Sequence, residues 1–169
     1  MSTAARISIK ENNGERKSIY LHWDGYIERA GIILQLAYNT EDRVRKLIDL
    51  GDLSVLGFYI EPKTAIHSFD TPDEDVCVAY HRDRGEELRF SDGRQHYNYV
   101  FDVTYGCWFV EDGHYSSDAT KILELDDLLP TRTSLLLDEI MELEDVIYEY
   151  WCVGVIRDCI EKAKEAVHN

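Results

Sequence analysis

Two short segments of the chain combine residue types that often do chemistry in proteins. The first, SIYLHWDGY at residues 18–26, places His22 and Asp24 two residues apart. The second, YHRDRGE at residues 80–86, repeats that spacing with His81 and Asp83. Two such pairs could meet as a metal site, or each carboxylate could orient a histidine that acts as a base. The simpler alternative is that each histidine is bonded to a neighbouring backbone group and that Asp24 prepares a turn.

The same segments could instead line a pocket for a nucleotide or a signalling molecule. Arginine binds phosphate through charge-assisted hydrogen bonds, and the second segment contains two arginines. The first segment would supply aromatic and polar side chains. The candidate pocket residues are Tyr20, His22, Asp24, His81, Arg82, Asp83 and Arg84.

The chain contains none of the common catalytic or cofactor-binding motifs. GxSxG, the P-loop and GxGxxG are absent, and the four cysteines show no CxxC spacing. HRDRG is similar to part of the catalytic loop of protein kinases, but no asparagine follows at the required offset. We therefore expect no catalytic residue, no metal and no cofactor. A hydrolase that uses the two histidine–aspartate pairs is the weakest alternative.

Strands and helices that would position these segments can be predicted from the periodicity of apolar residues. RISIK and KSIYLHW alternate apolar and polar residues around Asn13-Gly14, which predicts a hairpin. In its second strand, Ile19, Leu21 and Trp23 would point into the core, and we expect Trp23 to be a core anchor. From Ile27 onward the apolar residues follow a helical period, and a second helix ends at Gly51.

The later part of the chain predicts further strands and then a helical region. Residues 75–81, 97–105 and 107–112 are rich in β-branched and aromatic residues, which favour strands. Beyond Pro130 an apolar stripe at helical spacing continues to the end of the chain. The predicted fold is α+β, in one domain spanning residues 1–169. It has a mainly antiparallel sheet, two helices after the N-terminal hairpin and a long C-terminal helix.

The net charge of −15 is distributed unevenly along the chain. Residues 1–60 contain eight acids and eight bases, so the excess of acids begins after them and lies within residues 61–149. Such a region repels nucleic acid and favours a basic protein surface. The densest acidic segment predicts a partner-binding surface formed by Asp138, Glu139, Glu142, Asp145 and Glu149. No apolar run suits a membrane helix or a signal peptide, so we expect a cytoplasmic protein that does not bind membranes.

Three segments together resemble a family of small phage- and prophage-encoded proteins. They are IYLHWDGY at residues 19–26, LIDLGDLSVLG at 47–57 and AYHRDRGE at 79–86. The resemblance implies a bacterial host cytoplasm during infection or lysogeny and supplies no catalytic residue. We therefore expect an acidic, non-enzymatic inhibitor of a host defence or nucleic-acid-handling protein, anti-CRISPR-like or DNA-mimic-like, with small-molecule binding as the alternative.

Overall fold

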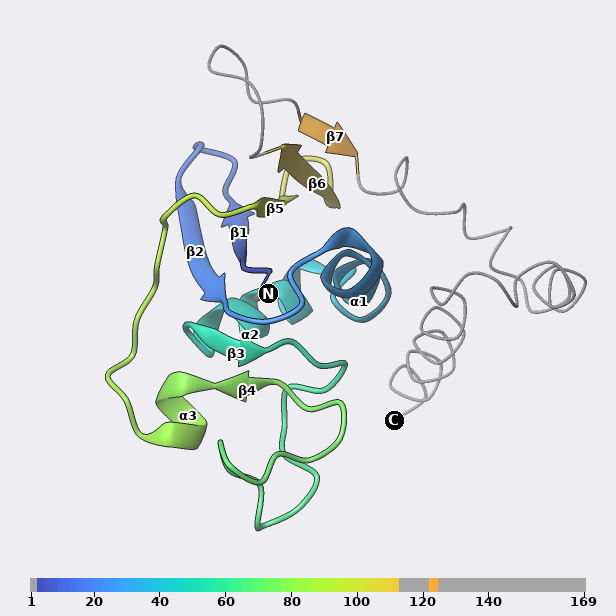
Figure 1. The fold of residues 1–169 in the computed structure, drawn as a ribbon. Helices are drawn as coiled ribbons and strands as arrows, with labels where there is room; N and C mark the ends of the chain where they lie inside the picture. The colour runs from blue at the N-terminus through green and yellow to red at the C-terminus, as the bar shows by residue number, and fades with distance from the viewer. Residues whose placement is uncertain (1–2, 113–121, 125–169) are drawn as a thin grey trace, which may run out of the picture.

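The computed structural model describes residues 3–112 and 122–124, which form a seven-stranded sheet with short helices (Figure 1). The order of the strands across the sheet is β4-β3-β2-β1-β5-β6-β7. The strands are β1 (Ala5–Lys10), β2 (Arg16–Leu21), β3 (Leu53–Val55), β4 (Val78–Ala79), β5 (Tyr97–Asp102), β6 (Cys107–Asp112) and β7 (Ile122–Glu124). The helices are the π-helical η1 (Ile27–Gly31), α1 (Ile32–Ala37), α2 (Glu41–Asp49) and α3 (Tyr80–Arg84).

The N-terminal hairpin agrees with the alternation read from the sequence. β1 and β2 pair antiparallel, with Ile7 opposite Ile19 and Ser8 opposite Ser18. Gly14 has a φ of 85° in the connecting turn, a conformation that glycine adopts without steric cost. Because side chains alternate along a strand, the isoleucines enter the core and the serines lie on the opposite face of the sheet.

The prediction of a mainly antiparallel sheet is wrong, because the sheet is mixed. β5 pairs parallel with β1, and β3 pairs parallel with β2. The reason is topological: the chain passes through η1, α1 and α2 between β2 and β3, and a crossover of this kind brings the next strand back parallel. The chain then runs from α3 past β2 before it enters β5 beside β1 (Figure 1).

The predicted long C-terminal helix falls on residues outside the described ranges. Within the part of the chain that the structure describes, the longest helix is α2, which spans nine residues. Residues 75–81 also differ from the prediction. There the strand β4 has only two residues and leads directly into α3, because the carboxylate of Asp83 accepts a hydrogen bond from the N–H of Ala79 and begins a helical turn.

The helices η1, α1 and α2 supply the apolar layer that packs on one face of the sheet. Val44, Leu47 and Ile48 of α2 are buried against the strands, and Trp108 Nε1 of β6 donates a hydrogen bond to the carbonyl of Tyr38 at 2.8 Å. The opposite face of β1, β2, β5 and β6 carries mostly polar side chains. This face is called the polar face below.

Candidate functional site

The polar face is organised as three rows of side chains that cross β2, β1, β5 and β6. Strand register places one residue of each strand in each row. The first row is Tyr20, Arg6, Asn98 and Glu111; the second is Ser18, Ser8, Val100 and Phe109; the third is Arg16, Lys10, Asp102 and Cys107.

The size of the side chains in these rows creates a pocket. The first and third rows contain long charged side chains and lie about 13 Å apart, four residues along each strand. Between them, Val100 is short and lines the pocket, and Phe109 lines it from β6; Ser8 and Ser18, whose hydroxyls lie 2.9 Å apart, are buried and do not line it. The result is a pocket of about 590 Å³, with Val100 at its base. This volume falls within the range typical of small-molecule sites.

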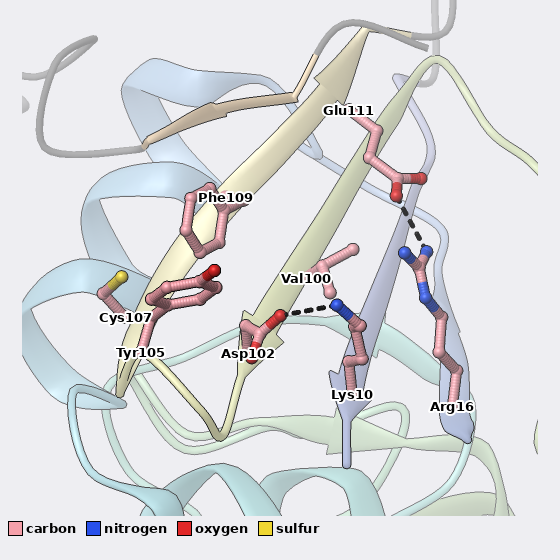
Figure 2. Close-up of a pocket in the computed structure, with 8 residues that line it drawn as sticks. All are labelled: Lys10, Arg16, Val100, Asp102, Tyr105, Cys107, Phe109 and Glu111. Carbon is pink, nitrogen blue, oxygen red and sulfur yellow. Dashed lines mark hydrogen bonds and ion pairs between the residues drawn. The ribbon is translucent and has the colours of Figure 1, made fainter. Parts of the chain in front are cut away.

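Glu111 is shared by two arginines from different strands of the hairpin. Arg6 Nη2 donates to Glu111 Oε2 at 2.9 Å, and Arg16 Nη1 donates to Glu111 Oε1 at 2.8 Å. Arg16 thereby reaches from the third row to the first, along the edge of the pocket (Figure 2). Burial is the main cause that lowers the pKa of Arg6; Glu111 opposes this shift, while Arg16 and Arg94 add to it.

A second ion pair lies in the third row of the polar face. Lys10 Nζ donates to Asp102 Oδ2 at 2.8 Å. Burial alone would raise the pKa of Asp102, but the hydrogen bonds from Lys10 and from the N–H of Thr104 outweigh it and lower the pKa. Asp102 is therefore held as a carboxylate, and Lys10 keeps a fixed position at the pocket wall.

Two aromatic residues close the pocket at the side opposite the cations. Tyr105 sits in the turn between β5 and β6, where its N–H and that of Gly106 both donate to the carbonyl of Asp102. Its ring lies 5.8 Å from that of Phe109 at an interplanar angle of 70°, and the residue is 71% exposed. Figure 2 shows Phe109 and Tyr105 at one end of the pocket, Lys10 and Arg16 at the other, and Val100 between them.

None of the seven candidate pocket residues named from the sequence lines this polar-face pocket. Strand β2 ends at Leu21, within the first segment. The chain then turns at Asp24, which has a φ of 57°. Tyr20 does lie in the first row, where its hydroxyl is 3.1 Å from His22 Nδ1. Burial is the main cause that raises the pKa of Tyr20, with smaller effects from Tyr80 and Asp52.

The prediction that Trp23 anchors the core is wrong. Ile19 and Leu21 are fully buried as expected, but Trp23 is 46% exposed and its ring packs edge-on against His22 at 4.6 Å. The alternation stops because the strand ends two residues before Trp23 and the backbone turns immediately after it. The buried tryptophan of the described sheet is Trp108 instead.

Arg82 and Asp83 hold a loop in place rather than facing a pocket. Arg82 donates to both oxygens of Asp83 and to the backbone carbonyls of Ile60 and Cys77. His67 Nε2 lies 3.4 Å from Asp83 Oδ2, and both side chains are almost fully buried. We call these five residues the α3 clasp. The hydrogen bonds of Arg82 are made within the protein, and its binding of phosphate stays a prediction.

Burial and hydrogen bonding act in opposite directions on the ion pair of the α3 clasp. For Asp83, burial alone would raise the pKa, but hydrogen bonds from Arg82 and from the N–H of Ala79 outweigh it and lower the pKa. For Arg82, burial alone would lower the pKa, but the carboxylate of Asp83 raises it overall. Both groups therefore stay charged, which is the state that holds the loop to α3.

The other two residues of the second segment lie at the surface. His81 Nδ1 is 2.7 Å from the carbonyl of Glu86, which matches the simpler alternative of a backbone-bonded histidine. Arg84 pairs with Glu86 at 3.3 Å and stacks over the ring of Phe69. His81 lines a recess of about 70 Å³ beside Asp52 and Tyr80, which is small for an organic ligand.

The two segments nevertheless lie on neighbouring strands. Leu21 of β2 pairs with Leu53 of β3, and Leu53 pairs with Ala79 of β4. Asp52 joins the segments, since its carboxylate accepts from the N–H of Tyr20 and its carbonyl accepts from the N–H of Tyr80. Among the described residues, no group of three or more histidine, cysteine or acidic side chains is placed to hold a metal ion.

Comparison of the chain with protein-family models, curated proteins and solved structures finds no match. The resemblance to phage-encoded proteins therefore stays a prediction. So does the acidic partner-binding surface, because Asp138, Glu139, Glu142, Asp145 and Glu149 lie outside the described residues. In the described part of the chain, no helix has the length and apolar character needed to cross a membrane.

Proposed function

We propose that this protein is a non-enzymatic binding protein that holds a small molecule in the polar-face pocket. The observation that carries the proposal is a pocket of about 590 Å³ lined by two ion pairs and an aromatic wall. Ligand sites in proteins combine this size with a few fixed polar groups and apolar surface. The four strands that form the pocket belong to one sheet, which gives the polar groups fixed positions before any ligand arrives.

The histidine–aspartate pairs give no comparable support for a hydrolase. Asp83 is bonded to Arg82 and lies beside His67, whereas His81 Nδ1 is directed at the carbonyl of Glu86. A general base needs a carboxylate or similar group that orients it and a substrate within hydrogen-bond reach. The contacts of His81 and Asp83 fit the stabilisation of α3 and its loop.

A fragment screen tests the proposed function. A library of neutral, cationic and anionic fragments is added to the full chain, and the thermal unfolding midpoint is measured. A ligand present at about 100 times its Kd should add about 2.7 kcal/mol to the free energy of unfolding. Val100→Phe places a ring inside the pocket and should abolish the stabilisation. Fragments that stabilise the wild type and this variant equally, or no stabilising fragment at all, would contradict the proposal.

The blocking experiment includes a second variant in case Val100→Phe does not fold. Val100 is 3% exposed at the base of the pocket, whereas Cys107 is only half-buried at its rim. Cys107→Phe therefore fills the same space with less disturbance of the sheet. A cooperative unfolding transition in either variant is the control that makes its loss of binding interpretable.

Binding of a basic protein surface is the second candidate function, favoured by the way the charges are used. Of the bases in the described part of the chain, eight are held in ion pairs with carboxylates: Arg6, Lys10, Arg16, Lys17, Arg45, Lys46, Arg82 and Arg84. Six of these eight bases lie within residues 1–60, and residues 61–149 contain many more acids than bases, so that region keeps a net negative charge. An uncompensated negative field speeds association with a basic partner.

This second candidate retains the phage setting and the inhibitor role that the resemblance implies. Its test is the triple variant with Glu142, Asp145 and Glu149 changed to Lys, compared with the wild type in capture of a bacterial partner across a salt series. The candidate predicts weaker capture and a smaller salt dependence in the variant. Unchanged affinity and unchanged salt dependence would remove it.

A further inference from the structure

We propose that the ligand of the polar-face pocket is an aromatic phosphate, with its ring against Tyr105 and its phosphate between Lys10 and Arg16. This inference rests on the proposed function, since it assigns the ligand class of that same pocket. Three features of the pocket carry it: a local surplus of positive charge, unused donors on the cations and an exposed aromatic face.

The charge surplus is local and opposite in sign to the net charge of the whole protein. Two cations that line the pocket, Lys10 and Arg16, face the two carboxylates Asp102 and Glu111; a third cation, Arg6, does not line the pocket but shares Glu111 with Arg16. Lys10 and Asp102 neutralise each other, so one carboxylate remains for two guanidinium groups. Arg94 and Asp92 also act on Arg6 and cancel each other in charge. An anion that enters beside Arg16 would supply the missing negative charge.

The cations at the pocket have donors left for a ligand. Among the contacts of the described residues, Arg16 donates one hydrogen bond, to Glu111, and Lys10 donates one, to Asp102. A guanidinium has five N–H groups and an ammonium has three. About a third of each side chain is exposed, 33% for Arg16 and 36% for Lys10, so these donors can reach a bound anion.

Arg6 adds a second sign that the arginine pair is incompletely satisfied. Its Nε–H is buried and has no hydrogen-bond partner, while its two terminal nitrogens donate to Glu111 and to the carbonyl of Asp92. A buried donor without an acceptor costs free energy, because it has lost its hydrogen bonds to water. A phosphate has several acceptor oxygens and could draw Arg16 away from Glu111, which would leave that carboxylate to Arg6 alone.

The aromatic end of the pocket selects a planar group. Tyr105 is strongly exposed although its backbone is fixed by the turn, and its ring stands nearly perpendicular to that of Phe109. A flat ring can therefore stack on one of these side chains and contact the edge of the other. Because the cations lie at the opposite end of the pocket (Figure 2), the ligand should carry its ring and its phosphate at opposite ends.

Isothermal titration calorimetry with three probes tests this inference. Adenosine 5′-monophosphate contains both groups, adenosine contains only the ring system and ribose, and inorganic phosphate contains only the anion. We expect the monophosphate to bind at least about tenfold more tightly than either other probe, since adenosine lacks the charge-assisted hydrogen bonds to phosphate and inorganic phosphate lacks the ring that stacks on Tyr105. The affinity should fall as salt is added.

Two pairs of variants locate the binding. Arg16→Gln should weaken monophosphate binding about tenfold and leave adenosine binding unchanged. Its matched control is Lys17→Gln, since Lys17 is the next residue of β2 and pairs with Asp49 on the other side of the strand. Tyr105→Ala should weaken both adenosine and the monophosphate, whereas Ile66→Ala, at a similarly exposed apolar residue, should change neither.

The results separate this inference from the proposed function. Equal affinities for adenosine and its monophosphate, or equal effects of Arg16→Gln and Lys17→Gln, overturn the aromatic phosphate. So does the absence of any binding by the monophosphate. In each of these cases the proposed function still holds if a fragment of another class binds and Val100→Phe blocks that binding. The proposed function is wrong if no fragment binds in this way.

Discussion

The polar-face pocket and the α3 clasp are both built from arginines, lysines and carboxylates, but they use these charges differently. In the clasp, Arg82 donates to Asp83 and to two carbonyls, and the carboxylate is almost fully buried. In the pocket, Arg16 and Lys10 each donate one hydrogen bond in the described structure and keep donors at the surface. Residue type alone therefore does not identify a binding site. A ligand can be bound only by donors that are not already used for hydrogen bonds within the protein.

The largest expected effect is on the clasp. Arg82→Ala leaves the carboxylate of Asp83 without its cation and removes the donor from the carbonyls of Ile60 and Cys77. Breaking a buried ion pair in this way typically costs about 3–5 kcal/mol. Arg84→Ala is the matched control, since Arg84 is exposed and its pair with Glu86 should contribute less than about 1 kcal/mol. Urea unfolding of both variants measures the difference, and similar losses would mean that the clasp does not hold the loop.

The clasp should also make stability depend on acidic pH. The folded-state pKa of Asp83 is lowered, so its contribution is fully present above the unfolded pKa of about 3.9 and is lost as pH falls through the folded value. Asp83→Asn should be less stable than the wild type at neutral pH, with a gap that narrows below about pH 4. Unfolding curves at several pH values check this. A gap that stays constant into acid would show that the ionised carboxylate is not what matters.

A smaller effect is expected at Trp23. Since about half of this residue is exposed, Trp23→Ala should reduce the free energy of unfolding by about 1 kcal/mol. Trp108→Ala is the contrasting change, because Trp108 is 1% exposed and should lose about 3–5 kcal/mol. Chemical denaturation of the two variants gives both values. If Trp23→Ala lowers the free energy of unfolding as much as Trp108→Ala does, Trp23 is a core residue and this account of it is wrong.

The smallest expected effect on stability is at the pocket cations. Arg16→Gln and Lys10→Gln should each change the free energy of unfolding by less than about 1 kcal/mol, because each removes a partly exposed ion pair. Equilibrium unfolding measures this directly. A loss as large as that of Arg82→Ala would place these cations in the same structural role as the clasp and would remove the contrast between the two regions.

The sequence predicts the local parts of this fold well and the long-range parts poorly. The hairpin and the helices that follow it depend on alternation, a turn and helical spacing within short segments. The parallel pairings of β1 with β5 and β2 with β3 depend on which distant strands meet, which no local pattern encodes. The prediction that Trp23 lies in the core is wrong because the alternation of apolar and polar residues continues for two residues beyond the end of the strand.

The pocket could not be predicted from the sequence, because it too depends on contacts between distant segments of the chain. Arg16 and Glu111 meet across 95 residues of sequence, and Lys10 and Asp102 across 92. Strand β1 shows the signal in part, because its polar residues Arg6, Ser8 and Lys10 alternate with apolar ones; in β5 the polar residues are Asn98 and Asp102. That alternation predicts a polar face, but only the strand register brings opposite charges together and leaves the short side chains between them.

Chemical-shift mapping tests the central claim most directly. The amide signals of the full chain are recorded while the tightest-binding small molecule is titrated in. The pocket account predicts saturable shifts that cluster at residues lining the polar-face pocket, among them Lys10, Arg16, Asp102, Tyr105 and Phe109. Shifts that cluster at Tyr20, His22, His81 and Glu86 instead would place the ligand at the two sequence motifs and would contradict the account.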